Sequence, residues 1–224
     1  MIIATWLLCF IAGSAFAQKV WNTNWAVGPH LSMSFPQSDF ADITKTGEGL
    51  GAKVFYRIES VPYFLPRLDF TYLSFGEKRS SLFEGYASYY DYITTRTESF
   101  QLLLGPQFAT KFGRVSLYFA PMFGLFNFRT LETIPIYYDP YYQSYYSYYT
   151  ETTHSLTRPG WAVNGGLYFD LGLGPVIDFE LKYQNISNAV QHTVNDQQVK
   201  SDVADLGISL GVVFFINKTK KRRY

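Results

Sequence analysis

Side chains with catalytic or metal-binding chemistry are scarce in this 224-residue chain, which has 3 histidines and 1 cysteine. His30 lies within an alternating apolar and polar run, whereas His154 and His192 lie in polar stretches that we expect to be loops. None of them stands at the spacing of a metal site or of a histidine-activated nucleophile. We therefore predict no cofactor, no metal and no enzymatic activity, although neighbouring strands could still bring together a set that is distant in sequence.

Charged residues recur at alternate positions of apolar runs, which directs them to one face of a sheet. Inside a barrel such charges must be paired, because an unpaired buried charge costs on the order of several kcal/mol. We predict an ion-pair network in the lumen, near His30, with these members: Lys53, Arg57, Arg67, Asp69, Asp170, Asp178, Glu180, Lys182 and Asp205. A structural polar core and a gated small pore both fit this set, whereas a general diffusion porin needs about 16 strands.

Eight runs of alternating apolar and polar residues follow one another, as in strands with two unlike faces. Their length is close to the roughly 9–11 residues with which a tilted strand crosses a bilayer. The sequence therefore predicts an all-β fold, an eight-stranded antiparallel up-and-down transmembrane β-barrel over residues 18–217. The runs are 25–35, 49–58, 67–72, 97–105, 115–125, 161–170, 177–184 and 205–216.

The connections between these runs alternate in length. Short ones are expected at 59–66, 110–113 and 172–174, and long ones at 36–48, 76–94, 129–159 and 186–201. Short periplasmic turns and long extracellular loops are typical of outer-membrane barrels. This pattern places both ends of the barrel in the periplasm.

The N-terminal residues 1–17 are typical of a signal peptide, because the apolar stretch 2–12 is followed by the small-residue pattern Ala15-Phe16-Ala17. A short membrane anchor is the alternative, but the stretch is below the roughly 20 residues that span a bilayer. Residues 218–224 are expected to form a basic periplasmic tail, which could meet anionic headgroups or a periplasmic partner. A net charge of +1 does not indicate a nucleic-acid partner.

A soluble eight-stranded barrel of the lipocalin type is the main competing architecture. The two differ in the face that carries the bulky apolar residues. Here the polar faces are rich in Gly, Ser and Ala, which suits a narrow lumen. The opposite faces carry Trp, Phe, Tyr and Leu, which favours contact with lipid.

The pattern resembles the small outer-membrane barrel families, including OmpA- and OmpX-like domains and barrels of the Bacteroidota type. The resemblance extends over the mature chain and is carried by segments such as 25–35, 175–185 and 206–216. It implies a bacterial outer-membrane location and contact with outer-membrane lipid and lipopolysaccharide. One departure is the C-terminus, where Phe214-Phe215-Ile216 is followed by the basic tail instead of ending on an aromatic residue.

Residues 183–189 resemble a segment of the lipid A 3-O-deacylase family. That family's catalytic histidine corresponds to Asn185, although Ser187 is present. Asparagine cannot act as the general base that takes a proton from serine. A lipid A-modifying enzyme is therefore the alternative reading, and not the main one.

The third long connection is unusually rich in tyrosine, a residue that binding loops favour. Its tyrosines are Tyr137, Tyr138, Tyr141, Tyr142, Tyr145, Tyr146, Tyr148 and Tyr149. They could contact an extracellular protein or glycan, or they could extend the hairpin or cover the barrel mouth. We predict a monomeric, non-enzymatic protein that acts in surface binding or envelope integrity. An accessory role in secretion or envelope assembly is a further alternative.

Overall fold

The computed structural model describes residues 24–58, 60–61, 64–81, 92–135, 148–172, 174–194 and 197–216. The expected signal peptide (1–17), the basic tail (218–224) and most of the Tyr-rich connection (137–147) lie outside these residues. Tyr148 and Tyr149 belong to a strand of the described part.

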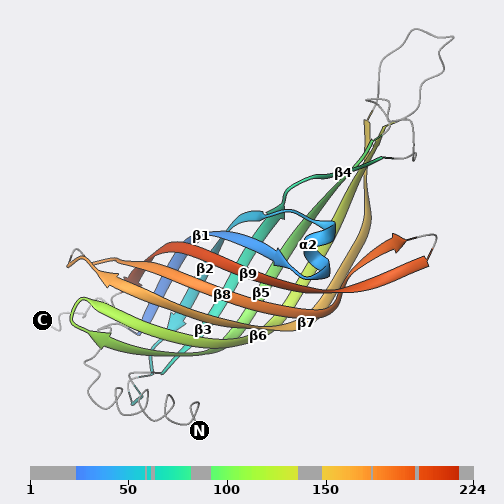
Figure 1. Cartoon of the computed structure of the whole chain (residues 1–224). Coiled ribbons are helices and arrows are strands. Elements are labelled where there is room, and N and C mark those ends of the chain that lie inside the picture. The colour runs from blue at the N-terminus through green and yellow to red at the C-terminus, as the bar shows by residue number, and fades with distance from the viewer. Residues whose placement is uncertain are drawn as a thin grey trace, which may run out of the picture.

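Strands make up nearly all of the described chain (Figure 1). The one short helix is α2 (Asp39–Ile43), between the first two strands. The strands are β1 (Trp25–Gln37), β2 (Gly47–Tyr56), β3 (Phe64–Phe75), β4 (Lys78–Ser81), β5 (Tyr92–Phe112), β6 (Val115–Pro135), β7 (Tyr148–Asp170), β8 (Val176–Val194) and β9 (Gln197–Ile216).

Eight of these strands close into an antiparallel up-and-down barrel, which confirms the predicted fold. The sheet runs in the order β3-β2-β1-β9-β8-β7-β6-β5-β4, and pairing between β3 and β5 closes it. The short strand β4 pairs with β5 alone, at Lys78 to Ser81, and stands outside the wall. Trp25 of β1 pairs with Ile216 of β9, so the barrel begins and ends at the rim that carries the short turns.

The outer wall is apolar and the interior is polar, as a membrane-spanning barrel requires. Leu31 and Phe123 on the outer wall are 70% and 68% exposed, whereas the charged side chains of Lys53 and Arg67 are fully buried inside. This arrangement is the reverse of a soluble barrel. Among the described residues, no helix has the length and apolar character needed to cross a membrane.

Aromatic pairs on the outer wall mark two levels. Near the short turns, Trp25 packs on Tyr56 with ring centroids 4.8 Å apart, and Phe64 packs on Phe108 at 5.7 Å. Near the opposite rim, the pairs are Tyr72 with Phe100 at 4.8 Å and Trp161 with Tyr183 at 5.7 Å. Aromatic girdles of this kind lie at the two membrane interfaces of outer-membrane barrels.

The strands on one side of the barrel are much longer than expected. β5 to β9 have 19–23 residues each, so most of the expected loops 129–159 and 186–201 are strand, and His154 and His192 lie in β7 and β8. In Figure 1 these strands continue well beyond the barrel. The expectation of loops was wrong because strand pairing outside a membrane needs only a partner strand and no apolar face.

Two apolar clusters lie inside the barrel. One, toward the long connections, includes Phe40 of α2, Phe75 and Phe128. The other, toward the short turns, includes Phe55 and Tyr168. Arg67 and Asp69 of β3, and Asp178 and Glu180 of β8, lie between these clusters, because each of these two strands contributes residues to both.

Candidate functional site

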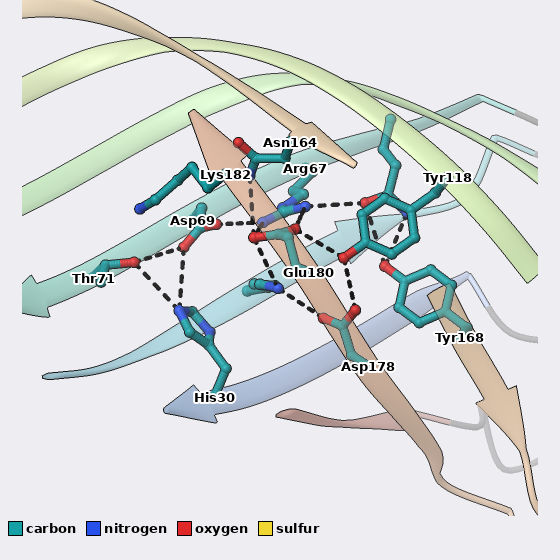
Figure 2. Close-up of polar contacts among 12 residues, drawn as sticks. His30, Arg67, Asp69, Thr71, Tyr118, Asn164, Tyr168, Asp178, Glu180 and Lys182 are labelled. Carbon is teal, nitrogen blue, oxygen red and sulfur yellow. Dashed lines mark hydrogen bonds and ion pairs between the residues drawn. The ribbon is translucent and has the colours of Figure 1, made fainter. Parts of the chain in front are cut away.

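An ion-pair network crosses the lumen and joins β8 to strands on the other side of the barrel (Figure 2). The Lys53 ammonium on β2 lies 2.7 Å from Asp178 Oδ2 and 3.2 Å from Glu180 Oε1, both on β8. Arg67 on β3 donates to Glu180 and also to Asp69 on its own strand. Asp178 and Glu180 are separated by one residue, so the β-strand period of two directs both carboxylates into the lumen.

Two tyrosines complete the network on the side of the short turns. The Tyr118 hydroxyl lies 2.7 Å from Asp178 Oδ1 and 2.9 Å from Glu180 Oε2, so it can donate to either carboxylate. Its ring stacks on Tyr168 with centroids 4.5 Å apart, and the Tyr168 hydroxyl accepts a hydrogen bond from Gln107 at 3.0 Å. Sequence reasoning missed these residues, although Tyr118 falls on the face of its strand that otherwise carries Ser116 and Ala120.

A glycine makes room for Tyr118. A Cβ atom at Gly166 would lie 2.4 Å from the Tyr118 hydroxyl oxygen and 2.4 Å from the Phe179 carbonyl oxygen. The small residue on β7 therefore sets the position of the tyrosine that binds both carboxylates.

Other members of the expected set are buried but bind neutral groups. Lys182 donates to Gln101 Oε1 at 2.8 Å, and Asp205 accepts from Gln184 Nε2 at 2.6 Å. His30, next to this set, lies 3.3 Å from the Thr71 hydroxyl and 4.0 Å from the Asp69 carboxylate. These three positions continue the polar interior toward the long connections.

Two expected members lie away from the central ion pairs. Arg57 is buried just beyond the end of β2, where its backbone N–H donates to the Asn24 carbonyl. Asp170 ends β7, and its carboxylate accepts the backbone N–H of Gly172 at 2.8 Å in an exposed turn. The expectation for Asp170 followed from strand parity alone, which cannot show how far along the strand the lumen extends.

The network closes the barrel at its level. Charged groups that line an aqueous channel are reached by water, whereas the side chains of Lys53, Arg67, Asp178 and Glu180 are 0–1% exposed. Arg67 also lies 5.8 Å from the Phe55 ring, which belongs to the apolar cluster near the short turns. The geometry therefore favours a structural core over a pore.

Outside the barrel, β7 and β8 separate. Their pairing runs from Asp170 to Trp161, which lies opposite Asn185, and residues 148–160 of β7 pair with β6 alone among the described residues. Pro159 has no N–H for a ladder hydrogen bond. On the other strand, the register with β9 shifts between Ile186 and Val190, and such a bulge bends a strand. The result is a fork between the β5–β6–β7 sheet and the β8–β9 hairpin (Figure 1).

The segment that resembles the lipid A deacylases lies at this fork. Asn185 is half-buried opposite Trp161, and Ser187 is exposed within the bulge. In the ranges that the structure describes, no group of three His, Cys, Asp or Glu residues is placed to hold a metal ion.

The sequence matches no protein-family model and no curated protein. Its fold is similar to solved outer-membrane barrels. Neisserial surface protein A superposes with a TM-score of 0.51, covering 87% of this chain and 98% of that one at 14% identity. Ail of Yersinia pestis, solved with the heparin analogue sucrose octasulfate, gives 0.48 over 85% and 97% at 17% identity. The N-terminal barrel of Pseudomonas aeruginosa OprF gives 0.39 over 86% and 98% at 12% identity.

Fold and interior together define the class of protein. The chain has the architecture of the small eight-stranded bacterial outer-membrane β-barrels, with an apolar wall and a closed polar core.

Proposed function

We propose that this chain is a non-enzymatic protein of the bacterial outer membrane that binds a surface partner through its extended hairpins. The observation that carries the proposal is the contrast between a closed interior and a long sheet outside it. The central charges are shielded from solvent, while β5, β6 and β7 continue past the barrel (Figure 1). We propose that the barrel anchors the extended hairpins in the membrane and that the hairpins carry the binding function.

The proposed orientation puts the extended hairpins outside the cell. They lie at the rim opposite the two-residue turn 113–114, and short turns face the periplasm in outer-membrane barrels. The expected signal peptide (1–17) and the periplasmic tail (218–224) agree with this orientation. The finer affiliation that we propose is with the OmpA/OmpX-like or Bacteroidota-type barrels.

The extended sheet offers an unpaired strand edge to a partner. Over residues 148–160 the β8 side of β7 has no strand neighbour in the described chain. Such an edge presents backbone N–H and C=O groups to an extended polypeptide. The other edge, β4, is short and begins with Lys78 and Arg79, features that discourage pairing.

The Tyr-rich connection lies between β6 and β7 in sequence, so it joins the two strands of the tall hairpin. Tyrosine supplies large contact area with little loss of side-chain entropy, which suits binding to a protein or glycan. We propose that Tyr137 to Tyr149 and the adjoining edge of β7 form the binding surface.

The test uses the whole protein on cells. One variant replaces residues 137–147 with a short Gly-Ser linker, and the matched control replaces residues 195–196, which connect β8 to β9 in the sequence. We expect the first variant to lose adhesion to host cells and to immobilised glycans, and the control to retain it. Unchanged adhesion of the first variant, with equal surface expression, would contradict the proposal.

The enzyme alternative has its own measurement. Mass spectrometry of lipid A from cells with and without the protein is expected to show the same acyl pattern. A change in that pattern would instead support the lipid A-modifying reading of Asn185 and Ser187.

A further inference from the structure

A cleft opens at the rim of the barrel opposite the short turns, between the start of β2, the end of β3 and the N-terminal part of β5. It is a wide-open cleft of about 500 Å³, a volume within the range of small-molecule sites. Its polar lining consists of Thr46, Glu48, Ser74, Glu77 and Arg96.

The wall of the cleft is held in place. The backbone N–H of Gly76 donates to the Thr46 carbonyl at 3.2 Å, which ties the end of β3 to the start of β2. Phe75, also in the lining, is buried against Phe40 of α2 with ring centroids 5.1 Å apart. The cleft is therefore backed by the apolar cluster inside the barrel.

Arg96 is the cation of the cleft. Its Nε donates to Ser74 Oγ at 3.1 Å, and its NH2 lies 3.5 Å from Glu98 Oε1. The side chain is nevertheless 43% exposed, so the guanidinium is oriented without being enclosed. A guanidinium presents five N–H donors in a fixed fork, which leaves donors for a phosphate.

The cleft lies just above an aromatic row of the outer wall. Ser74 is opposite Glu98, and the next outward pair toward the short turns is Tyr72 opposite Phe100. One step further, Phe70 and Leu102 form an apolar pair. Because aromatic rows mark the interface, the cleft lies at the depth of lipid headgroups.

The charges around the cleft have both signs. Glu48 and Glu77 are exposed carboxylates and Arg96 is a guanidinium. A ligand with only a phosphate would be repelled by the carboxylates. A ligand with only an ammonium would be repelled by the guanidinium. A ligand that carries both groups can pair each one with its opposite charge.

We propose that this cleft binds a phosphoethanolamine group, with the phosphate on Arg96 and the ammonium on Glu48 and Glu77. An ammonium has three N–H donors for carboxylates, whereas the trimethylated nitrogen of choline has none, so phosphocholine is a poor fit. The group can come from a phospholipid or from a decorated lipopolysaccharide. Access from the outer leaflet rests on the orientation given under the proposed function.

The experiment uses the mature full-length protein, refolded in a non-ionic detergent, so that no zwitterionic headgroup competes for the cleft. Glycerophosphoethanolamine, glycerophosphocholine and glycerophosphate are titrated separately, and the Ser74 and Gly76 amide signals are followed by NMR. The variants are Arg96→Gln and the double variant Glu48→Gln/Glu77→Gln. The control is Arg129→Gln, which removes an exposed arginine of the same wall that lies over Phe100, 5.2 Å from its ring centroid, and outside the cleft.

We expect glycerophosphoethanolamine to bind about tenfold more tightly than the other two probes, since it alone offers a phosphate to Arg96 and N–H donors to the carboxylates. Both cleft variants should lose this preference, and Arg129→Gln should keep it. Equal binding of all three probes would overturn the proposal, as would an equal loss in Arg129→Gln. Loss of binding on addition of EDTA would also overturn it, in favour of a phosphate bridged by a divalent cation.

A second experiment distinguishes the two sources of the phosphoethanolamine group, phospholipid and lipopolysaccharide. Nanodiscs of phosphatidylglycerol, with or without phosphatidylethanolamine, are compared with lipopolysaccharide that carries or lacks phosphoethanolamine. Perturbation of the Ser74 and Gly76 signals in either pair supports the proposal and assigns the source. Unchanged Ser74 and Gly76 signals in both pairs overturn the proposal. The adhesion of the variant with residues 137–147 replaced still tests the proposed function separately.

Discussion

The Lys53 ammonium lies 2.7 Å from Asp178 Oδ2 and so joins β2 to β8 through the centre of the barrel. β1 and β9 lie between these two strands in the barrel wall. The contact is therefore made across the lumen and not between neighbouring strands of the wall. Glu180 lies next to this pair and also binds Arg67 of β3. A single strand, β8, therefore supplies carboxylates to cations from two strands that face it.

The first prediction concerns Glu180→Gln. Removing this carboxylate leaves Lys53 and Arg67 with less buried counter-charge, and breaking a buried ion pair costs about 3–5 kcal/mol. We expect the folded band in a detergent gel to convert to the unfolded band at a clearly lower temperature. Asp170→Asn is the control, since that carboxylate lies in an exposed turn. Equal melting of the two variants would show that the central network does not stabilise the barrel.

The second prediction concerns conductance. Because the central charges are 0–1% exposed, the protein in a planar lipid bilayer should show no discrete current steps. A diffusion porin recorded in the same membrane provides the positive control. Regular unitary steps from the pure protein would support the gated-pore reading instead.

The third prediction uses two adjacent glycines of β7. Gly166→Ala places a Cβ against the Tyr118 hydroxyl and the Phe179 carbonyl, and such overpacking costs about 1–3 kcal/mol. At Gly165 the nearest atom to an added Cβ is 3.9 Å away, so Gly165→Ala should leave the melting temperature of the folded band nearly unchanged. Similar loss in both variants would contradict the role assigned to Gly166.

The fourth prediction concerns Phe40, the residue through which α2 packs into the apolar cluster toward the long connections. Its side chain is fully buried and packs edge-on against Phe75 and Phe128. A buried Phe→Ala change costs about 3–5 kcal/mol, which corresponds to at least about a hundredfold easier local opening. We expect Phe40→Ala to be cleaved by trypsin after Lys45 much faster than wild type. The neighbouring exposed change Asp39→Ala should leave the cleavage rate as it is.

The fifth prediction tests the fork by hydrogen exchange. An antiparallel strand with one neighbour protects only alternate amides, because the others point to its free edge. In β7, we expect fast and slow amides to alternate over residues 148–160 and uniform protection from Trp161 to Asp170. Uniform protection of both segments would mean that another strand covers the edge.

Much of the barrel could be predicted because its signal is local. The run 177–184 alternates strictly, and the structure places Ile177, Phe179 and Leu181 outside and Asp178, Glu180 and Lys182 inside. The extended hairpins could not be predicted in this way. Residues 148–160 form strand because β6 lies beside them, and that partner is distant in a reading of the local pattern.

The cleft at the rim could not be predicted from the sequence either. Glu48, Ser74 and Arg96 belong to three strands, and only the closure of β3 onto β5 brings Ser74 within 3.1 Å of Arg96. The contacts of Tyr118 could not be predicted either. The alternation of its strand places its side chain inside the barrel, but only the fold brings it to Asp178 and Glu180.

Alternation along the sequence determined by itself which residues of this protein face inward and which face lipid, because side chains in a strand point to opposite sides with period two. It also determined the number of strands in the wall. Which inward charges become partners depends on the stagger between strands when the barrel closes, a property of the whole sheet. The tertiary structure alone therefore decided that Lys53 meets Asp178, that Asp170 lies apart, and that β7 and β8 separate beyond Trp161.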